Sequence, residues 1–279
     1  LFLTDCMSVE PLLLSQLART SSLPVVLQAV WEGLAIQKWN ADQLTTIEKR
    51  LASINLLQNL HRAQLCERDM LNAYLEKLRE DGGVDPFNPA ILDESWWQPT
   101  GWLDQNQLRY NDHYMRFSRR AIDLEARTIQ PSVAVEQKKF FAEMSRSHPY
   151  NIITSIAALS LASAIPPFGD GQTKVDLARI ACLIELHKLR NGKYPSELAE
   201  LQSPLPADPY SGKPYLYRTA SGPEAGERYH LYGVGWNQED DGGRIFLDED
   251  GNIEPKKGDL VWRYSPVPTL PETEEAEEK

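Results

Sequence analysis

The spacing of the apolar residues changes once along this chain of 279 residues, and the change constrains the fold. From residue 8 to 79, and again from 103 to 165, apolar residues recur every three or four positions, as amphipathic helices require. Leu44, Ile47, Leu51 and Ile54 form one such stripe. After Asn191-Gly192 the period becomes two, which is typical of strands. The sequence therefore predicts an α+β protein: antiparallel helices first, then a long helix packed on a small antiparallel sheet.

Local signals divide the helical region further. Pro24 is expected to interrupt one helix and restart the chain into the next. Asn40-Ala-Asp-Gln43 predicts a capping box, in which Asn40 caps the new helix and Gln43 reaches back to it. A further helix should stop at Asp81-Gly-Gly83. Helical periodicity then extends from 103 to 127 and from 132 to 146.

Pro166-Pro-Phe-Gly-Asp-Gly171 is the clearest predicted boundary, because proline and glycine both disfavour helix interiors. It separates a predicted all-helical domain at 1–165, which carries an aromatic-rich loop at 82–102, from an α+β domain at 172–265. Residues 266–279 are predicted to be a disordered acidic tail, because a run of like charges with little to bury does not fold.

Within the α+β domain, an apolar helix should end at Gly192, which can adopt a left-handed backbone conformation. Short strands are predicted to follow, separated by turns rich in glycine and aspartate. They cover residues 215–219, 229–234, 245–247 and 260–264.

Charge and cysteine content exclude some functions and leave others open. The formal net charge is 29 − 40 = −11, and no long basic run is present, so nucleic acid is not an expected partner. Cys6, Cys66 and Cys182 are far apart and form no zinc or redox motif. Buried free thiols are expected, with a Cys6–Cys66 bridge as the alternative in an oxidising compartment.

The order of motifs after residue 175 resembles the soluble head of the type II secretion major pseudopilins. Three of them follow one another: Leu189-Arg-Asn-Gly-Lys-Tyr-Pro195, then Asp208-Pro-Tyr-Ser-Gly-Lys-Pro-Tyr215, then Tyr229-His-Leu-Tyr-Gly-Val-Gly235. A closing Gly258-Asp-Leu-Val-Trp262 completes the series. About 170 residues precede this head, whereas a pilin places its membrane helix directly ahead, so assembly into a pseudopilus is not expected.

The stretches 8–17, 40–43 and 101–107 also resemble a group of uncharacterised bacterial envelope proteins that join a helical region to this head. That resemblance implies a periplasmic or cell-envelope location, a membrane anchor upstream of Leu1, and other envelope proteins as partners. The apolar stretch 152–165 is too short to cross a bilayer, which takes about 20 residues. Membrane contact is therefore expected only through an upstream segment.

An acidic loop between residues 239 and 259 is the predicted metal site. Calcium prefers six to eight oxygen ligands on a turning backbone, and pseudopilin heads bind calcium in the corresponding loop. The alternative interpretation is a set of ordinary solvated turns. The candidate calcium ligands are Asp240, Asp241, Asp248, Asp250 and Asp259.

Aromatic residues gather around the second helical segment and form the candidate interaction surface. They are Trp96, Trp97, Trp102, Tyr110 and Tyr114. Aromatic side chains are enriched at protein interfaces. They could equally attach the 82–102 loop to the helical core.

No catalytic signature is present: the sequence has no G-x-S-x-G, no H-E-x-x-H and no complete glycine-rich phosphate loop, and its five histidines are dispersed. The leading hypothesis is a non-enzymatic structural or interaction protein of the envelope, and stabilisation by calcium is a further hypothesis. The alternative is a hydrolase or other enzyme of unrecognised type with a site between its two domains.

Overall fold

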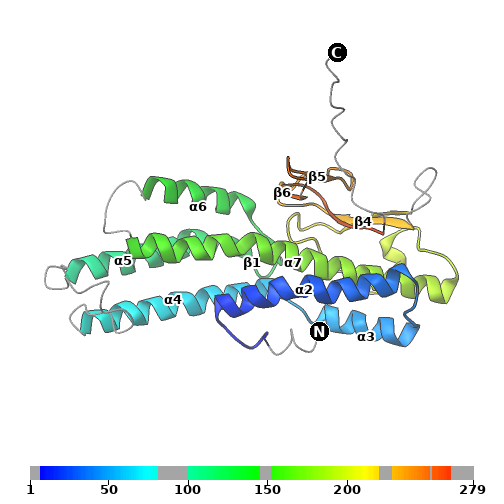
Figure 1. Cartoon of the computed structure of the whole chain (residues 1–279), viewed down its shortest axis with the longest axis horizontal. Coiled ribbons are helices and arrows are strands. Elements are labelled where there is room, and N and C mark those ends of the chain that lie inside the picture. Colours follow the sequence, from blue (N-terminus) through cyan, green and yellow to red (C-terminus); the bar gives the residue numbers. More distant parts are fainter. Residues whose placement is uncertain (1–6, 81–99, 145–151, 220–227, 252, 265–279) are drawn as a thin grey trace, which may run out of the picture. The chain divides into compact units, whose positions relative to one another are not determined.

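The computed structural model describes residues 7–80, 100–144, 152–219, 228–251 and 253–264, and it confirms the α+β class (Figure 1). Its contacts divide the chain into two compact units. Unit 1 contains residues 1–26 and 54–172, and unit 2 contains residues 27–53 and 173–279. The predicted boundary segment 166–171 lies within α7 (Ile152–Asn191), next to the position at which the two units divide this helix, and residues 27–53 belong to unit 2.

Unit 1 is built almost wholly of helices. It takes the first part of α2 (Leu13–Ala35) and of α7 (Ile152–Asn191), together with α4 (Leu56–Glu80), α5 (Thr100–His113) and α6 (Pro131–Met144). Leucines at 56, 57, 60, 75 and 78 of α4 are buried on one face, as helical spacing requires. This face forms much of the core of unit 1.

The predicted helix from 103 to 127 is wrong in its second half. After α5 the chain forms one turn of π-helix, η2 (Tyr114–Ser118), and then a small hairpin of β1 (Ile122–Asp123) and β2 (Thr128–Ile129). The Asp123 carboxylate accepts the Ala126 N–H across the turn, at 2.9 Å. Strands of two residues are too short to show a period in the sequence, so the hairpin was not predicted.

The expected helix breaks at Pro24 and Pro166-Pro167 are also wrong, because α2 and α7 continue through these prolines. A proline inside a helix costs about 3 kcal/mol, so packing must outweigh it. In α7 the apolar neighbours Ile165 and Phe168 are completely buried. A Cβ at Gly171 would lie only 3.0 Å from side-chain atoms of Leu56 and Thr20, so the glycine permits close helix packing.

Unit 2 combines helices with three strands in the order β3-β4-β7. The strands β3 (Leu216–Thr219), β4 (Tyr229–Gly233) and β7 (Leu260–Trp262) are antiparallel, with Leu216 opposite Tyr232 and Leu231 opposite Trp262. A second pair, β5 (Ile245–Leu247) and β6 (Ile253–Gly258), forms its own hairpin. The predicted strands are confirmed within one or two residues at their ends, and β6 is additional.

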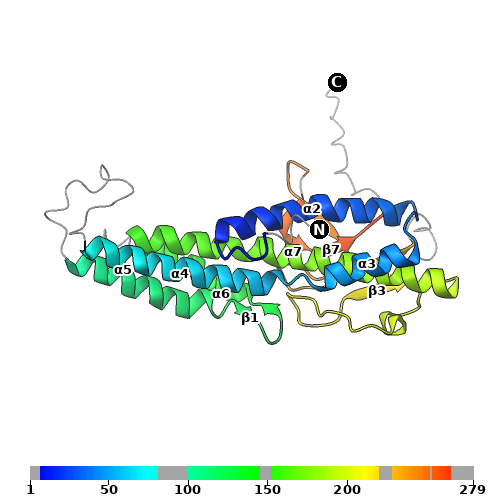
Figure 2. The same ribbon diagram turned by 90° about the horizontal axis from the view of Figure 1, so that it is seen from below.

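Residues 27–53 join unit 2 through specific polar contacts. The Trp31 indole N–H donates to the Arg263 carbonyl at 2.5 Å, although 232 residues separate them. The Glu48 carboxylate of α3 (Ala41–Ala52) pairs with Arg179 of α7 at 2.7 Å, and Figure 2 shows α3 beside this part of α7. The Arg228 guanidinium donates to the carbonyls of Leu34 and Ala35 at the end of α2. Such contacts satisfy the last carbonyls of a helix.

The Asn40–Gln43 capping box is confirmed, with both reciprocal hydrogen bonds present. Gly192 has φ 75°, in the left-handed region predicted for it. Most of the 82–102 loop, Cys6 and the 266–279 tail lie outside the described residues. In the part of the chain that the structure describes, no helix is long and apolar enough for a membrane span.

Candidate functional site

The turn between α7 and β3 in unit 2 is held by one buried carboxylate. Asp208 accepts the backbone N–H groups of Tyr210 and Val234, each at 2.9 Å, and the Ser211 hydroxyl at 3.1 Å. Its own N–H donates to the Lys213 carbonyl at 2.8 Å. Burial raises the pKa of the Asp208 carboxyl above its usual range, although these donors oppose the shift. The carboxylate thus fixes the turn to the strand that follows it.

A buried tyrosine attaches the same turn to α7. The Tyr215 hydroxyl donates to the Asp176 carboxylate at 3.2 Å, and burial raises the pKa of Tyr215 well above its usual value. A Cβ at Gly233 would lie 2.8 Å from the Tyr215 ring, so β4 must carry glycine where the ring crosses it. The two aspartates and the tyrosine therefore form a rigid support inside unit 2.

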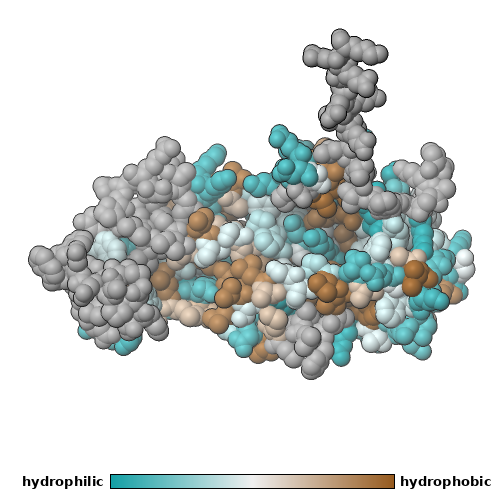
Figure 3. Space-filling model, in the orientation of Figure 1, coloured by the Kyte–Doolittle hydropathy of each residue, from teal (hydrophilic) through white to brown (hydrophobic). Residues whose placement is uncertain are grey.

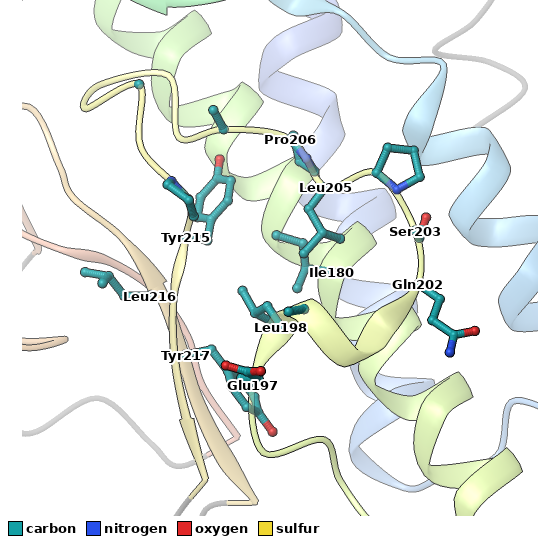
Figure 4. A pocket seen from close by; sticks show the side chains of 15 residues that line it. Ile180, Glu197, Leu198, Gln202, Ser203, Leu205, Pro206, Tyr215, Leu216 and Tyr217 are labelled. Atoms are coloured by element: carbon teal, nitrogen blue, oxygen red, sulfur yellow. The ribbon is translucent and has the colours of Figure 1, made fainter.

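An open groove lies on this support. It has a volume of about 940 Å³ and is bounded by residues 197–207 on one side and 214–217 on the other. Figure 4 shows Leu198 and Leu205 facing the extended chain at 215–217, with Ile180 of α7 behind them. The short 3₁₀ helix η4 (Leu198–Leu201) carries part of the wall. The lining is mainly apolar, with Glu197, Gln202 and Ser203 as its polar members.

The groove adjoins the free edge of the sheet. β3 pairs with β4 on one side only, so within the described residues it is an edge strand, and Leu216 and Tyr217 at its start also line the groove. An edge strand offers backbone N–H and C=O groups to another extended chain. An apolar groove beside such an edge can accept alternate side chains of that chain.

Comparison with known proteins gives no assignment. No family model, curated protein or solved structure matches the chain.

The predicted calcium ligands are not brought together as a set. Among the described residues, no group of three or more Asp, Glu, His or Cys side chains is arranged to hold a metal ion. Asp240 accepts the Tyr232 hydroxyl at 3.2 Å and the Gly242 N–H at 2.9 Å. Asp241 accepts the Asn237 amide at 2.8 Å. These carboxylates are engaged in local turn contacts.

The other predicted ligands, Asp248, Asp250 and Asp259, are not gathered around one point either. Asp248 accepts the Asp250 N–H at 3.1 Å in the β5–β6 turn. Asp259 is 5% exposed and accepts the Gly243 N–H at 2.7 Å, but its second oxygen has no hydrogen-bond partner. Burial raises the pKa of the Asp259 carboxyl to about 6. Calcium takes six to eight oxygen ligands; the described residues bring no three of these carboxylates together, and calcium binding at this loop stays a prediction.

The predicted aromatic surface is largely interior. Tyr110 and Tyr114 are 1% exposed, and Trp102 packs against the buried cluster of Leu75, Leu78 and Leu103 in unit 1. Trp96 and Trp97 lie outside the described residues. On the face drawn in Figure 3, exposed apolar residues are interspersed with hydrophilic ones. Aromatic content is a weak guide to interfaces because the same side chains favour cores.

Sequence reasoning missed the groove. Its walls come from segments with ordinary composition, and the only local signal is the alternation Pro204-Leu-Pro206 after η4. Prolines there prevent the chain from continuing a helix and keep it extended. The groove itself depends on how far this segment stands from β3, which spacing in the sequence does not reveal.

Proposed function

We propose that this chain is a non-enzymatic protein of the bacterial cell envelope that binds an extended segment of another envelope protein. The segment would lie in the groove and pair with the edge of β3. The observation that carries the proposal is the apolar groove of about 940 Å³ directly beside an edge strand. Calcium has no step in this function.

Backbone pairing and side-chain burial would make different contributions to binding. Hydrogen bonds along β3 supply affinity that does not depend on sequence, and pockets for alternate side chains supply specificity. Leu198, Leu205 and Pro206 are half-buried, so an apolar side chain placed against them removes further area from water. The rigid support from Asp208 and Tyr215 lowers the entropic cost of binding, because the groove wall is already ordered.

The groove favours binding over catalysis. Among the described residues that line it, Glu197 is the only carboxylate, and none is a histidine or a cysteine. A hydrolytic site instead brings a nucleophile and a base within hydrogen-bond reach of each other. The envelope location rests on the resemblance to pseudopilin heads.

The test is selection of short random peptides displayed on phage against the purified chain. We expect enrichment of extended peptides with alternating apolar residues. Ala199 is exposed in the groove, so Ala199→Trp should fill it without disturbing the fold. Leu205→Glu should place a charge in its wall. Fluorescence anisotropy of a selected peptide should show at least about tenfold weaker binding to either variant, which corresponds to about 1.4 kcal/mol.

The matched control is Leu189→Glu. Leu189 is 55% exposed on α7 and lies outside the groove, so the same substitution there should leave peptide affinity unchanged. Failure to enrich any peptide, or equal binding by all three variants, would contradict the proposal.

A further inference from the structure

The peptide groove of unit 2 carries one charged side chain. Of the described residues that bound it, Glu197 alone is charged, and it is exposed. Its side chain does not cap η4, the short helix that it precedes, and no ion pair with it is present in the part of the chain that the structure describes. Two other carboxylates of unit 2 are paired: Glu48 with Arg179 at 2.7 Å and Glu185 with Arg228 at 3.5 Å. The Glu197 carboxylate is therefore available to a ligand.

An aromatic ring lies at the same end of the groove as this carboxylate. Figure 4 shows Tyr217 and Glu197 together there, and both line the groove. The Tyr217 hydroxyl donates to the Pro195 carbonyl at 2.8 Å, so the ring is held against the segment that leads into Glu197. The Tyr229 ring packs on it, with 5.8 Å between the ring centroids. Because these contacts fix the ring before a ligand binds, little entropy is lost when a side chain is placed on it.

Elsewhere in unit 2, cations occupy the space between a carboxylate and tyrosine rings. The Lys188 ammonium lies 4.6 Å from the centroid of the Tyr194 ring, and the Arg228 guanidinium lies 4.8 Å from that of Tyr264. Glu185 serves both, because it accepts the Tyr194 hydroxyl at 3.1 Å and pairs with Arg228. A cation gains there from the carboxylate charge and from the negative face of the ring.

Glu197 and Tyr217 offer the same two groups at the groove, and no lysine, arginine or histidine is among the described residues that line it. Burial raises the pKa of the Tyr217 hydroxyl to about 12, and the charges of Glu200 and Glu185 add to this shift. The surroundings of the ring are thus negative as well as partly apolar. A lysine or arginine side chain suits such a place, because its methylene stem packs on apolar surface while its charged end meets the carboxylate.

The position of this end of the groove also sets the spacing of the bound side chains. A peptide paired with β3 would direct every second side chain to the groove. Apolar side chains would then contact Leu198 and Leu205, and the side chain that reaches Glu197 would come from a residue on the same side of the peptide. The basic residue would therefore lie two or four positions from an apolar one.

We propose that Glu197 and Tyr217 form a subsite for a lysine or arginine of the bound peptide, so that the groove selects extended segments with apolar residues and one basic residue on the same side. This inference rests on the proposed function, because it assigns a specificity to the same groove. The partner would thus be an apolar segment with a positive charge at one end.

The experiment starts from the peptides that the wild-type chain enriches. Each is synthesised in two forms, one with its basic residue and one with glutamine in that place. Fluorescence anisotropy at constant ionic strength measures both forms against wild type, Glu197→Gln and Glu197→Lys. The matched control is Glu249→Lys, which makes the same change in net charge at an exposed position of the β5–β6 turn, outside the groove.

We expect the basic form to bind wild type about fivefold more tightly than the glutamine form, as an exposed ion pair with a cation–π contact allows. This preference should fall to about twofold or less in Glu197→Gln and disappear or reverse in Glu197→Lys. In Glu249→Lys it should stay within about twofold of the wild-type preference, because a distant exposed charge is screened by salt.

The outcomes separate this inference from the proposed function. Enriched apolar peptides that bind wild type with no preference for a basic residue would overturn the basic subsite and leave the peptide groove supported. An equal loss of preference in Glu249→Lys and Glu197→Lys would also overturn the subsite, because net charge would then account for the selection. If no peptide is enriched, both proposals fail.

Discussion

Both units bury polar side chains, but they bury different kinds. The buried polar residues described in unit 1 include Gln16, Gln64, Asn106, Gln137 and Gln172, and none of them is a carboxylate. Those described in unit 2 are mainly Asp176, Glu185, Asp208 and Asp259. A buried carboxylate needs several donors, whereas a buried amide tolerates partial satisfaction at lower cost.

The amides of unit 1 and the carboxylates of unit 2 stabilise different kinds of local structure. In unit 1 an amide completes a helix end: the Gln172 side chain accepts the N–H of Leu56 at 2.7 Å, where α4 begins. In unit 2 carboxylates fix irregular chain, as Asp208 does for the turn before β3. Sensitivity to pH should therefore come from carboxylates in unit 2, whereas in unit 1 it should come from the buried His113, whose pKa burial lowers to about 4.

The largest expected effect is from Asp208→Ala. It leaves the N–H groups of Tyr210 and Val234 buried without their acceptor, so unit 2 should lose about 3 kcal/mol of unfolding free energy. Urea denaturation measures the loss, and hydrogen exchange of peptides covering 204–214 locates it. Asp250→Ala, at an exposed position of the β5–β6 turn, should change stability by less than about 0.5 kcal/mol. A similar small effect at both positions would remove the contrast between the units.

A smaller effect is expected from the titration of Asp259. Burial raises its pKa to about 6, above the value of about 3.9 in an unfolded chain. The folded state therefore holds more protons on Asp259 between pH 4 and 6, so the contribution of this carboxyl to the unfolding free energy should fall by on the order of 2 kcal/mol as pH rises through this range. Burial also raises the pKa of Asp208 and Glu185, which contributes in the same direction, whereas burial lowers the pKa of His113 to about 4, which contributes in the opposite direction. The Asp259 contribution is therefore the difference between the urea-denaturation profiles of wild type and Asp259→Asn, and identical slopes would show that Asp259 makes none.

The smallest effect is predicted for Gln64→Leu in unit 1. Gln64 is completely buried, and among the residues that the structure describes neither its amide nitrogen nor its oxygen has a hydrogen-bond partner. A leucine of similar size removes that desolvation cost, so unfolding free energy should rise by about 1 kcal/mol. Gln58→Leu, exposed on the same helix, is the control and should have little effect. Destabilisation by Gln64→Leu in thermal denaturation would instead indicate a polar partner in this core.

Sequence patterns predicted those parts of the fold that depend on nearby residues. The Asn40–Gln43 cap and the conformation of Gly192 are set within a few positions, and both are confirmed. The prolines at 24, 166 and 167 were misleading because contacts from distant helices override their local preference. β6 was missed because Glu254-Pro-Lys-Lys257 lacks apolar alternation, and its pairing with β5 decides its structure.

The sites were harder to predict than the fold. The five aspartates share a loop in the sequence, but neighbouring backbone N–H groups occupy several of their oxygens. The groove takes Ile180 from α7, Leu198 and Leu205 from the following segment and Leu216 from β3, and only the fold brings these distant residues to one place. Sequence proximity suggested a metal site among the aspartates and did not reveal the groove.

The contact between Trp31 and Arg263 has a consequence for how the protein is made. Residues 27–53 leave the ribosome early, yet their partners in unit 2 are synthesised up to 232 positions later. At 5–20 residues per second, this early segment must wait roughly 10–50 seconds for them. The apolar face of Leu44 and Leu51 is uncovered during that time, so unit 2 should fold last and depend on chaperones during synthesis.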